Sequence, residues 1–195
     1  MLRIAALILS AGQSTRFGGC KQLAVIDSKP LLQHAIDKAC AVCESHVYVV
    51  SGAWHSAISA AVDKGDVHNA VLINNLSWSD GIGSSIAYGV SKLSTQYDAI
   101  LILLGDQVAM ELRELTSMVG SLGNSDIICA HYLGTRGVPA LFRRSTFPTL
   151  MSLTGDHGAK KLLYQDDFIV SEYTMSSACI DIDTKEALLK WQTRN

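Results

Sequence analysis

The sequence predicts an α/β fold in which one mostly parallel β-sheet is covered by helices on both faces. Up to residue 124, apolar runs rich in Val, Ile and Leu alternate with helical patterns, the order of a parallel sheet with crossover helices. Beyond residue 124, strands follow one another without an intervening helix, which predicts an antiparallel flank. The length of 195 residues, without a linker or an internal repeat, predicts a single domain over residues 1–195.

The apolar runs of the first part predict short buried strands. They are IAALIL (4–9), HVYVV (46–50), AVLIN (70–74) and AILILL (99–104). A helical pattern follows each strand, in the segment after Pro30 and over 55–63, 84–93 and 111–122. Ser28, placed ahead of Pro30, predicts an N-cap and a first-turn proline for the first long helix.

The flank starts with a predicted strand over 126–132, a turn over 134–139 and a strand over 140–142. Two helical stretches between 146 and 165 come next. Strands over 168–175 and 179–183 and a last helix from Thr184 complete the chain. On a strand, the side chains of Asp181 and Asp183 share one face, because side chains alternate.

Composition excludes several classes of function. The formal net charge of -2 leaves no broad basic surface, so we expect no nucleic-acid partner. No apolar run reaches the roughly 18 residues of a membrane span, so we expect no membrane partner and a cytoplasmic location. The five cysteines are an odd number without a dense framework, which suits a reducing compartment. Cys40 and Cys43 recur with apolar residues at helical spacing and are interpreted as core residues.

The segment LILSAGQSTRFGGCKQL (7–23) begins as an apolar strand and becomes a glycine-rich loop. The loop holds three glycines and two cations: Gly12, Gly18, Gly19, Arg16 and Lys21. Ligands of open α/β sheets bind outside the carboxyl ends of the strands, and glycine amides together with cations suit a phosphate there. The spacing up to Lys21 excludes a Walker loop, and Ser14 stands where a dinucleotide fingerprint needs its second glycine.

This loop resembles the nucleotide-binding signature of the molybdenum cofactor nucleotidyltransferase family. Five signature positions are in register: Gly12, Ser14, Arg16, Gly18 and Lys21. Phe17 replaces the usual methionine, and Ser10 replaces an alanine. Later segments are similar to further motifs of the family and carry the resemblance through most of the chain: NNLSWSDGIGSSIAYGV, LLGDQV, GTRGVPALF, LTGDHGAKKLL and DIDTKEAL.

The resemblance implies a single-domain, Rossmann-like, three-layer α/β/α nucleotidyltransferase fold. The implied reaction is attack by the terminal phosphate of molybdenum-loaded molybdopterin on the α-phosphate of a nucleoside triphosphate, with release of pyrophosphate. Ala11 beside Gly12 favours CTP, because the guanylyl branch of the family usually has two glycines there. The implied partners are CTP, or another nucleoside triphosphate, and molybdopterin, with a recipient molybdoenzyme as a third. The implied cofactor is Mg²⁺.

The resemblance also indicates the residues of the site. The expected nucleotide contacts are Leu9, Ser10, Ala11, Gly12, Ser14, Arg16, Gly18, Lys21, Asn75, Gly81, Ser84 and Ser85. The expected catalytic residues are Lys21, Arg16 and Asp106. Lys21 would meet the β- and γ-phosphates as a compact charge and Arg16 as a planar fork. Asn75 to Ser85 leads into a helix, whose first amides suit a further phosphate.

Asp106 follows the most apolar strand of the chain and therefore emerges beside the first loop. A carboxylate there suits Mg²⁺, which usually takes one or two protein carboxylates and completes its shell with phosphate and water. The alternative is a capping aspartate before the next helix. Asp183 is expected as the second metal contact, with Asp181 as the alternative, and Asp183-Thr184 equally suits a helix cap.

Trp78, Asp156 and His157 are expected on the pterin side, where Trp78 either stacks on a ring or simply packs. Two residues depart from the family pattern: Val108 replaces a proline after Gly-Asp-Gln, and Val138 replaces a histidine before Pro139. The first is expected to loosen a turn. The second removes a polar side chain from the acceptor side and leaves the acceptor open.

Three interpretations therefore stand. The first is a molybdenum cofactor cytidylyltransferase. The second is a related nucleotidyltransferase that uses GTP or another phosphorylated acceptor, such as a sugar or alditol phosphate. The third is a carrier or chaperone that holds the cofactor without transferring a nucleotide. Lys21 and Asp106 favour an enzyme, because a carrier needs no pyrophosphate cation beside a metal carboxylate. Val138 favours the carrier.

Overall fold

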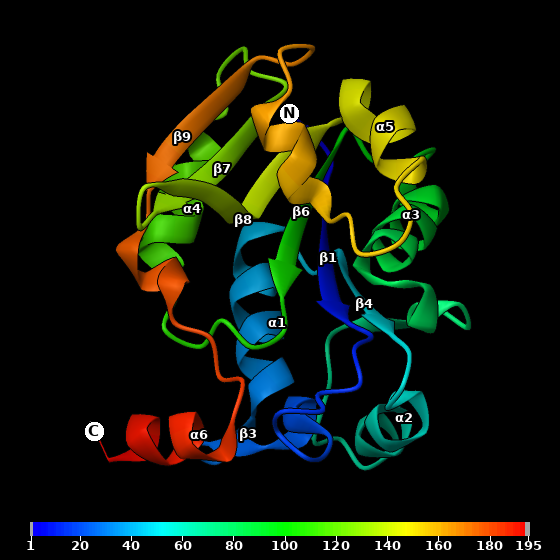
Figure 1. Cartoon of the computed structure of the whole chain (residues 1–195), viewed down its shortest axis with the longest axis vertical. Coiled ribbons are helices and arrows are strands. Elements are labelled where there is room, and N and C mark those ends of the chain that lie inside the picture. Colours follow the sequence, from blue (N-terminus) through cyan, green and yellow to red (C-terminus); the bar gives the residue numbers. More distant parts are fainter. Residues whose placement is uncertain (1, 194–195) are drawn as a thin grey trace.

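The computed structural model describes residues 2–193, and a seven-stranded sheet forms its centre (Figure 1). The strand order is β5-β4-β1-β6-β8-β7-β9. The strands are β1 (Ile4–Ser10), β4 (Val47–Ser51), β5 (Val71–Asn74), β6 (Ala99–Leu104), β7 (Ile127–Tyr132), β8 (Thr135–Arg143) and β9 (Val170–Thr174). β8 is antiparallel to both of its neighbours, and the other strand pairs are parallel. The predicted mostly parallel sheet with an antiparallel flank is confirmed.

Helices cover both faces of this sheet. The α-helices are α1 (Leu31–Val42), α2 (His55–Asp63), α3 (Ile82–Leu93), α4 (Leu112–Gly120), α5 (Phe147–Met151) and α6 (Lys185–Gln192). Short 3₁₀ helices span Lys21–Leu23, Trp78–Asp80, Arg144–Thr146, Ala159–Tyr164 and Ser176–Cys179. Buried side chains of α1, α2 and α4 form one core cluster with the sheet, and those of α3 and α5 form another. The three layers are therefore helix, sheet and helix.

β1 and β6 lie side by side at the centre, with Leu9 opposite Leu104 at their carboxyl ends. Both strands read as almost continuous apolar runs because helices bury both of their faces. α3 approaches β1 closely: a Cβ on Gly89 would lie 2.7 Å from the Leu7 side chain. Figure 1 shows the carboxyl ends of β1, β4 and β6 at the same edge, toward β3 and α6.

The predicted turn over 134–139 is wrong. β8 starts at Thr135, so the reversal from β7 is made by Leu133 and Gly134 alone. Both residues have left-handed φ values, of 51° and 72°. Two consecutive left-handed residues are the requirement of the tight hairpin turn that matches strand twist. The glycine and proline signals further along misplaced the turn, since Gly137 and Pro139 lie within the strand.

The predicted strand over 179–183 is also wrong, and with it the argument that Asp181 and Asp183 share a strand face. A 3₁₀ helix, Ser176–Cys179, is followed by irregular chain up to α6. The single apolar anchor is Ile182, which is 1% exposed against the Phe17 side of the first loop. Because Ile182 is buried between two aspartates, apolar and polar residues alternate here as they do in a strand, although the segment forms none.

The two predicted helix caps differ in outcome. The Thr184 side chain accepts a 3.1 Å hydrogen bond from the Ala187 amide and caps α6, which settles the capping role on Thr184 rather than Asp183. Ser28 does not cap α1: with Asp27 it forms the left-handed turn between β2 (Val25–Ile26) and β3 (Lys29–Pro30). No side chain caps the start of α1.

Within residues 2–193, no helix is both long and apolar enough to cross a membrane. The five cysteines are free thiols. Cys43 is buried, and Cys40 packs, partly buried, against the same core cluster, as expected. Burial raises the pKa of the Cys43 thiol to about 12, which makes it a poor nucleophile.

Candidate active site

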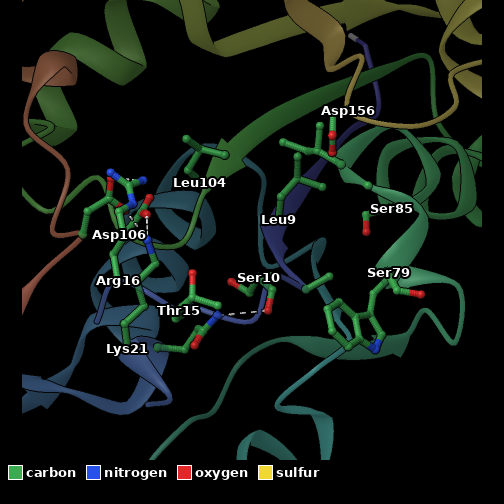
Figure 2. A pocket seen from close by; sticks show the side chains of 18 residues that line it. Leu9, Ser10, Thr15, Arg16, Lys21, Ser79, Ser85, Leu104, Asp106 and Asp156 are labelled. Atoms are coloured by element: carbon green, nitrogen blue, oxygen red, sulfur yellow. Dashed lines mark hydrogen bonds and ion pairs between the residues drawn. The ribbon is translucent and has the colours of Figure 1, made fainter. Parts of the chain in front are cut away.

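A cavity of about 450 Å³ opens at the carboxyl ends of β1 and β6. Figure 2 shows Arg16, Lys21 and Asp106 together at one side of this cavity, and Ser79 and Ser85 at the other. The loop after β1, the loop after β6 and the start of α3 supply most of the lining. This is the edge at which parallel α/β sheets bind ligands.

The loop after β1 presents free backbone amides to the cavity. The Ser14 carbonyl accepts from the amides of Phe17 (3.0 Å) and Gly18 (3.1 Å), which closes a turn in which Gly18 has a φ of 72°. In the part of the chain that the structure describes, the amides of residues 12–16 donate to no protein group. A Cβ on Gly12 would meet nothing within 4 Å, so the space beyond it is open. Such a loop suits a phosphate.

Phe17 anchors this loop to the end of the chain. Its ring is 7% exposed and packs with Ile26, Leu31 and Ile182. The Ile182 amide also donates to the carbonyl of Asp106, at 3.3 Å. These contacts bring the segment before α6 against the first loop and explain how Asp183 reaches the site.

Lys21 lies between two carboxylates. Its Nζ donates to Oδ1 of Asp183 at 2.7 Å and forms a shorter ion pair with Asp106. Arg16 approaches the other oxygen of Asp183 at 2.8 Å. The Lys21 side chain is 16% exposed and that of Arg16 is 74% exposed, so the lysine is enclosed and the arginine faces solvent.

The pKa values follow from this arrangement. Burial opposes the charge on Lys21, but Asp106 and Asp183 outweigh it and raise its pKa. The hydrogen bond from Lys21, opposed in part by burial, lowers the pKa of Asp183. Among residues 2–193, Asp181 has no such bond. Its side chain is exposed, and partial desolvation, followed by the charges of Asp106 and Asp183, raises its pKa above the ordinary value. Asp183 is therefore the second carboxylate that faces the cations.

Three buried oxygens of the lining have no hydrogen-bond partner among residues 2–193: Ser10 Oγ, Ser14 Oγ and Asp106 Oδ1. A buried polar atom without a partner is costly, so these atoms are poised for a ligand. A divalent cation such as Mg²⁺ prefers oxygen ligands and needs only one or two carboxylates from protein. Asp106 and Asp183 fit that requirement. Within residues 2–193, no group of three or more His, Cys, Asp or Glu side chains lies close enough together to hold a metal ion.

The loop over 75–85 closes the opposite end of the cavity. The buried Asn75 donates from Nδ2 to the hydroxyls of Ser84 (3.0 Å) and Ser85 (3.1 Å) and accepts from the Ser77 amide at 3.0 Å. Gly81 has a φ of 101° and packs directly on the backbone of Gly155. Asn75 and Ser84 thus fix the loop from behind.

Most of the expected site residues line the cavity. They are Leu9, Ser10, Ala11, Gly12, Ser14, Arg16, Lys21, Trp78, Gly81, Ser85, Asp106, Asp156 and Asp183. Four of the expected residues lie outside the lining: Gly18, Asn75, Ser84 and His157. Asn75 and Ser84 hold the loop over 75–85 through side-chain hydrogen bonds, whereas Gly18 and His157 make backbone contacts. His157 presents its carbonyl oxygen, rather than its ring, to the close approach of Gly83.

Sequence reasoning missed five lining residues: Thr15, Gln22, Ser79, Ile82 and Leu104. Leu104 pairs with Leu9 at the end of β6, so its place followed from the strand register. Gln22 donates to the Ser10 carbonyl at 3.2 Å, and no spacing rule signals that contact.

Val108 and Val138, the two residues that depart from the family pattern, have different surroundings. The Val108 turn is closed by its own amide, which donates to the Asp106 carbonyl at 3.0 Å, a bond that proline would not allow. Val138 lines a second cavity of about 210 Å³, which shares Leu9, Ile82 and Leu104 with the first. Most of its lining is apolar, with Arg136 and Lys160 as the charged side chains.

Comparison with known proteins shows the family and supports the fold. The family model described as a MobA-like NTP transferase domain matches residues 6–169. The chain is 28% identical over 192 residues to the purine catabolism protein PucB of Bacillus subtilis, covering 92% of this chain and 91% of PucB. It is 32% identical over 123 residues to the bifunctional protein GlmU of Sorangium cellulosum, covering 61% of this chain but only 26% of GlmU. The chain thus spans about a quarter of that relative.

Solved structures share the whole fold. Rv0371c from Mycobacterium tuberculosis H37Rv superposes with a TM-score of 0.82 at 24% identity, covering 98% of both chains. A second Rv0371c structure, in complex with manganese, has a TM-score of 0.79 at 23% identity, covering 99% of this chain and all of that one. Molybdopterin-guanine dinucleotide biosynthesis protein A from Archaeoglobus fulgidus has a TM-score of 0.72 at 15% identity, covering 97% of both.

Proposed function

Because the chain belongs to the family of MobA-like NTP transferase domains, we propose that it transfers CMP from CTP to the terminal phosphate of molybdopterin and releases pyrophosphate. Nucleotidyl transfer itself follows from the family and the fold. The choice of CTP and of molybdopterin is the finer part of the proposal. Nucleotidyl transfer at this site is supported by one observation above all: Lys21, Asp106 and Asp183 meet beside a loop whose amides donate to no protein group among residues 2–193.

Positively charged side chains and backbone amides have separate roles toward the phosphates. Lys21 and Arg16 neutralise the β- and γ-phosphates and so stabilise pyrophosphate as it leaves. The amides of the first loop bind phosphate oxygens and hold the α-phosphate in place. In-line attack by a phosphate needs no protein nucleophile, which agrees with a lining that contains no cysteine and no histidine.

Asp106 and Asp183 are the residues that would hold Mg²⁺ or Mn²⁺. When bound, such a cation offsets negative charge on the phosphates. In the structure the ammonium group of Lys21 lies between these two carboxylates. Both carboxylates would be available to a cation once Lys21 paired with phosphate instead.

CTP is favoured over GTP by Ala11, which stands where the guanylyl branch usually has a glycine. Ala11 is 6% exposed and lines the cavity, so its methyl group removes space near the nucleotide. Molybdopterin is supported by the resemblance of the later segments and by the likeness to a molybdopterin-guanine dinucleotide biosynthesis protein.

One observation favours a second candidate. The apolar cavity around Val138 adjoins the phosphate site and offers few polar partners to a pterin. It suits an enzyme that uses a phosphorylated acceptor other than a pterin.

The test is pyrophosphate release with Mg²⁺ and molybdenum-loaded molybdopterin, with CTP and GTP compared in the wild type and in Lys21→Ala. The proposal predicts release with CTP that depends on both molybdopterin and Lys21. Release with GTP alone points to the guanylyl alternative. Tight binding of molybdopterin without release from any nucleoside triphosphate overturns the enzyme and supports the carrier.

A further inference from the structure

We propose that the Trp78 indole is the wall against which the nucleobase stacks, and that Gly52 fixes its position and so helps to select the base. This inference rests on the proposed nucleotide site and moves Trp78 from the pterin side to the base side. It concerns the end of the main cavity that the phosphate chemistry does not use.

The cavity has a charged end and a largely neutral end. At the charged end, Arg16 and Lys21 from the loop after β1 meet Asp106, which follows β6, and Asp183, which precedes α6. Gly52 follows β4, which lies on the other side of β1 from β6. A Cβ placed on Gly52 would lie 2.4 Å from Cβ of Trp78, so Trp78 belongs to the β4 end. With a triphosphate at the charged end, the base extends toward Trp78.

The base of the Trp78 side chain packs directly on the backbone at Gly52. At Gly52, the added Cβ would also lie 2.5 Å from Cγ of Trp78 and 2.8 Å from the Ala11 carbonyl oxygen. Real Cβ atoms essentially never approach so closely, so only glycine at position 52 lets Trp78 pack over the first loop. The distance from Trp78 to the first loop is therefore set by backbone.

The loop that carries Trp78 is fixed at two further points. Asn75 ties Ser77 to Ser84 and Ser85, as described above. At the other end, the Gly83 amide donates to the Gly155 carbonyl at 2.9 Å. A loop held at these points fixes the backbone that carries the indole, and aromatic side chains bind the π-face of a base.

The indole is also free to take this role. Trp78 lines the cavity, is only partly buried, and donates no hydrogen bond to the protein within residues 2–193. Trp54, by contrast, donates from Nε1 to the Gln13 carbonyl at 2.9 Å and does not line the cavity. Trp191 packs near Phe17. Trp78 is thus the tryptophan whose fluorescence reports on the base.

The experiment uses a protein in which Trp54→Phe and Trp191→Phe leave Trp78 as the single tryptophan. CTP is expected to quench its fluorescence, whereas inorganic tripolyphosphate, which has no base, binds without quenching. Calorimetry on the same samples measures binding independently. CTP that binds by calorimetry without a change in Trp78 fluorescence overturns the inference and leaves the proposed function intact. Failure of every nucleoside triphosphate to bind overturns both.

Selectivity gives a second readout that a merely structural tryptophan would not move. Trp78→Ala is expected to weaken CTP binding by roughly tenfold and to leave tripolyphosphate binding unchanged. The preference for CTP over GTP should fall with it, because the cavity becomes wider at the base. Trp78→Phe keeps an aromatic face and should retain most of the affinity. Gly52→Ala should resemble Trp78→Ala, and an unchanged CTP-to-GTP preference in both variants overturns the role.

Discussion

Lys21 donates a 2.7 Å hydrogen bond to Asp183, although 162 positions separate the two residues in the chain. The bond joins the loop after β1 to the segment before α6 at the charged end of the cavity. With Asp106 on the other side, the same ammonium group also pairs with the loop after β6. Lys21, which we propose for the phosphates, is therefore paired in the structure with both carboxylates that we propose for the metal.

Lys21→Ala should lower kcat/KM for pyrophosphate release by about 100-fold. Loss of one electrostatic contact to the transition state typically costs roughly 3 kcal/mol, which corresponds to a factor of that size. Lys29→Ala is the control, because Lys29 is an exposed lysine paired with Asp37. Equal activity of the two variants would remove Lys21 from the pyrophosphate site.

Asp183→Asn should weaken Mn²⁺ binding in the presence of CTP at least about tenfold, since even residues that only support metal ligands usually cost that much. Asp181→Asn is the matched control, because Asp181 is two positions away and does not line the cavity. Calorimetric titration of Mn²⁺ into the CTP complex measures both. A larger loss in Asp181→Asn would exchange the roles of the two aspartates.

Gly81→Ala should destabilise the protein by about 2 kcal/mol or more. Its φ of 101° strains any side chain, and the added Cβ would lie 2.3 Å from the Gly155 backbone. Gly120→Ala, at the end of α4, would meet nothing within 4 Å and should be neutral or slightly stabilising. Urea unfolding compares the two, and similar midpoints would contradict the close packing at Gly81.

The lowered pKa of Lys38 predicts that the free energy of unfolding depends on pH. Burial, only partly offset by Asp37, lowers the pKa of Lys38 to about 8, while its Nζ donates to the Val108 carbonyl at 2.8 Å. Between pH 8 and the unfolded value of 10.5, the unfolded chain binds more protons, so this residue makes stability rise with pH. Below pH 8 the buried charge is a constant cost.

Lys38→Met removes that titration. Relative to the variant, the wild type should gain on the order of 2 kcal/mol in free energy of unfolding between pH 7 and pH 10.5, after a discount for partial solvent contact. Urea unfolding of both proteins at these two values measures the difference. A difference that does not change with pH would show that Lys38 titrates normally.

Much of this fold could be predicted from the sequence, because strands buried on both faces leave long apolar runs. The run before Asp106 located both β6 and the edge where its carboxylate emerges. Short-range signals were less reliable. Gly137 and Pro139 suggested a turn inside β8, whereas Leu133, an apolar residue in a left-handed conformation, makes the real one.

The sequence motif located residues that line the main cavity, such as Gly12, Arg16 and Lys21. Contacts between distant segments were not predictable. The sequence favoured Asp183 over Asp181 but not the reason, which is that the packing of Phe17 on Ile182 brings Asp183 to Lys21. The contact between Gly52 and Trp78 joins loops from two different crossovers, and no local spacing encodes it.

The most direct test of the central claim follows the α-phosphate. CTP labelled at that phosphate is incubated with Mg²⁺, molybdenum-loaded molybdopterin and the protein, and the products are separated. The account predicts label in a molybdopterin cytosine dinucleotide, with one unlabelled pyrophosphate released for each labelled product. Label that remains in CTP, while the same protein binds molybdopterin, would contradict it.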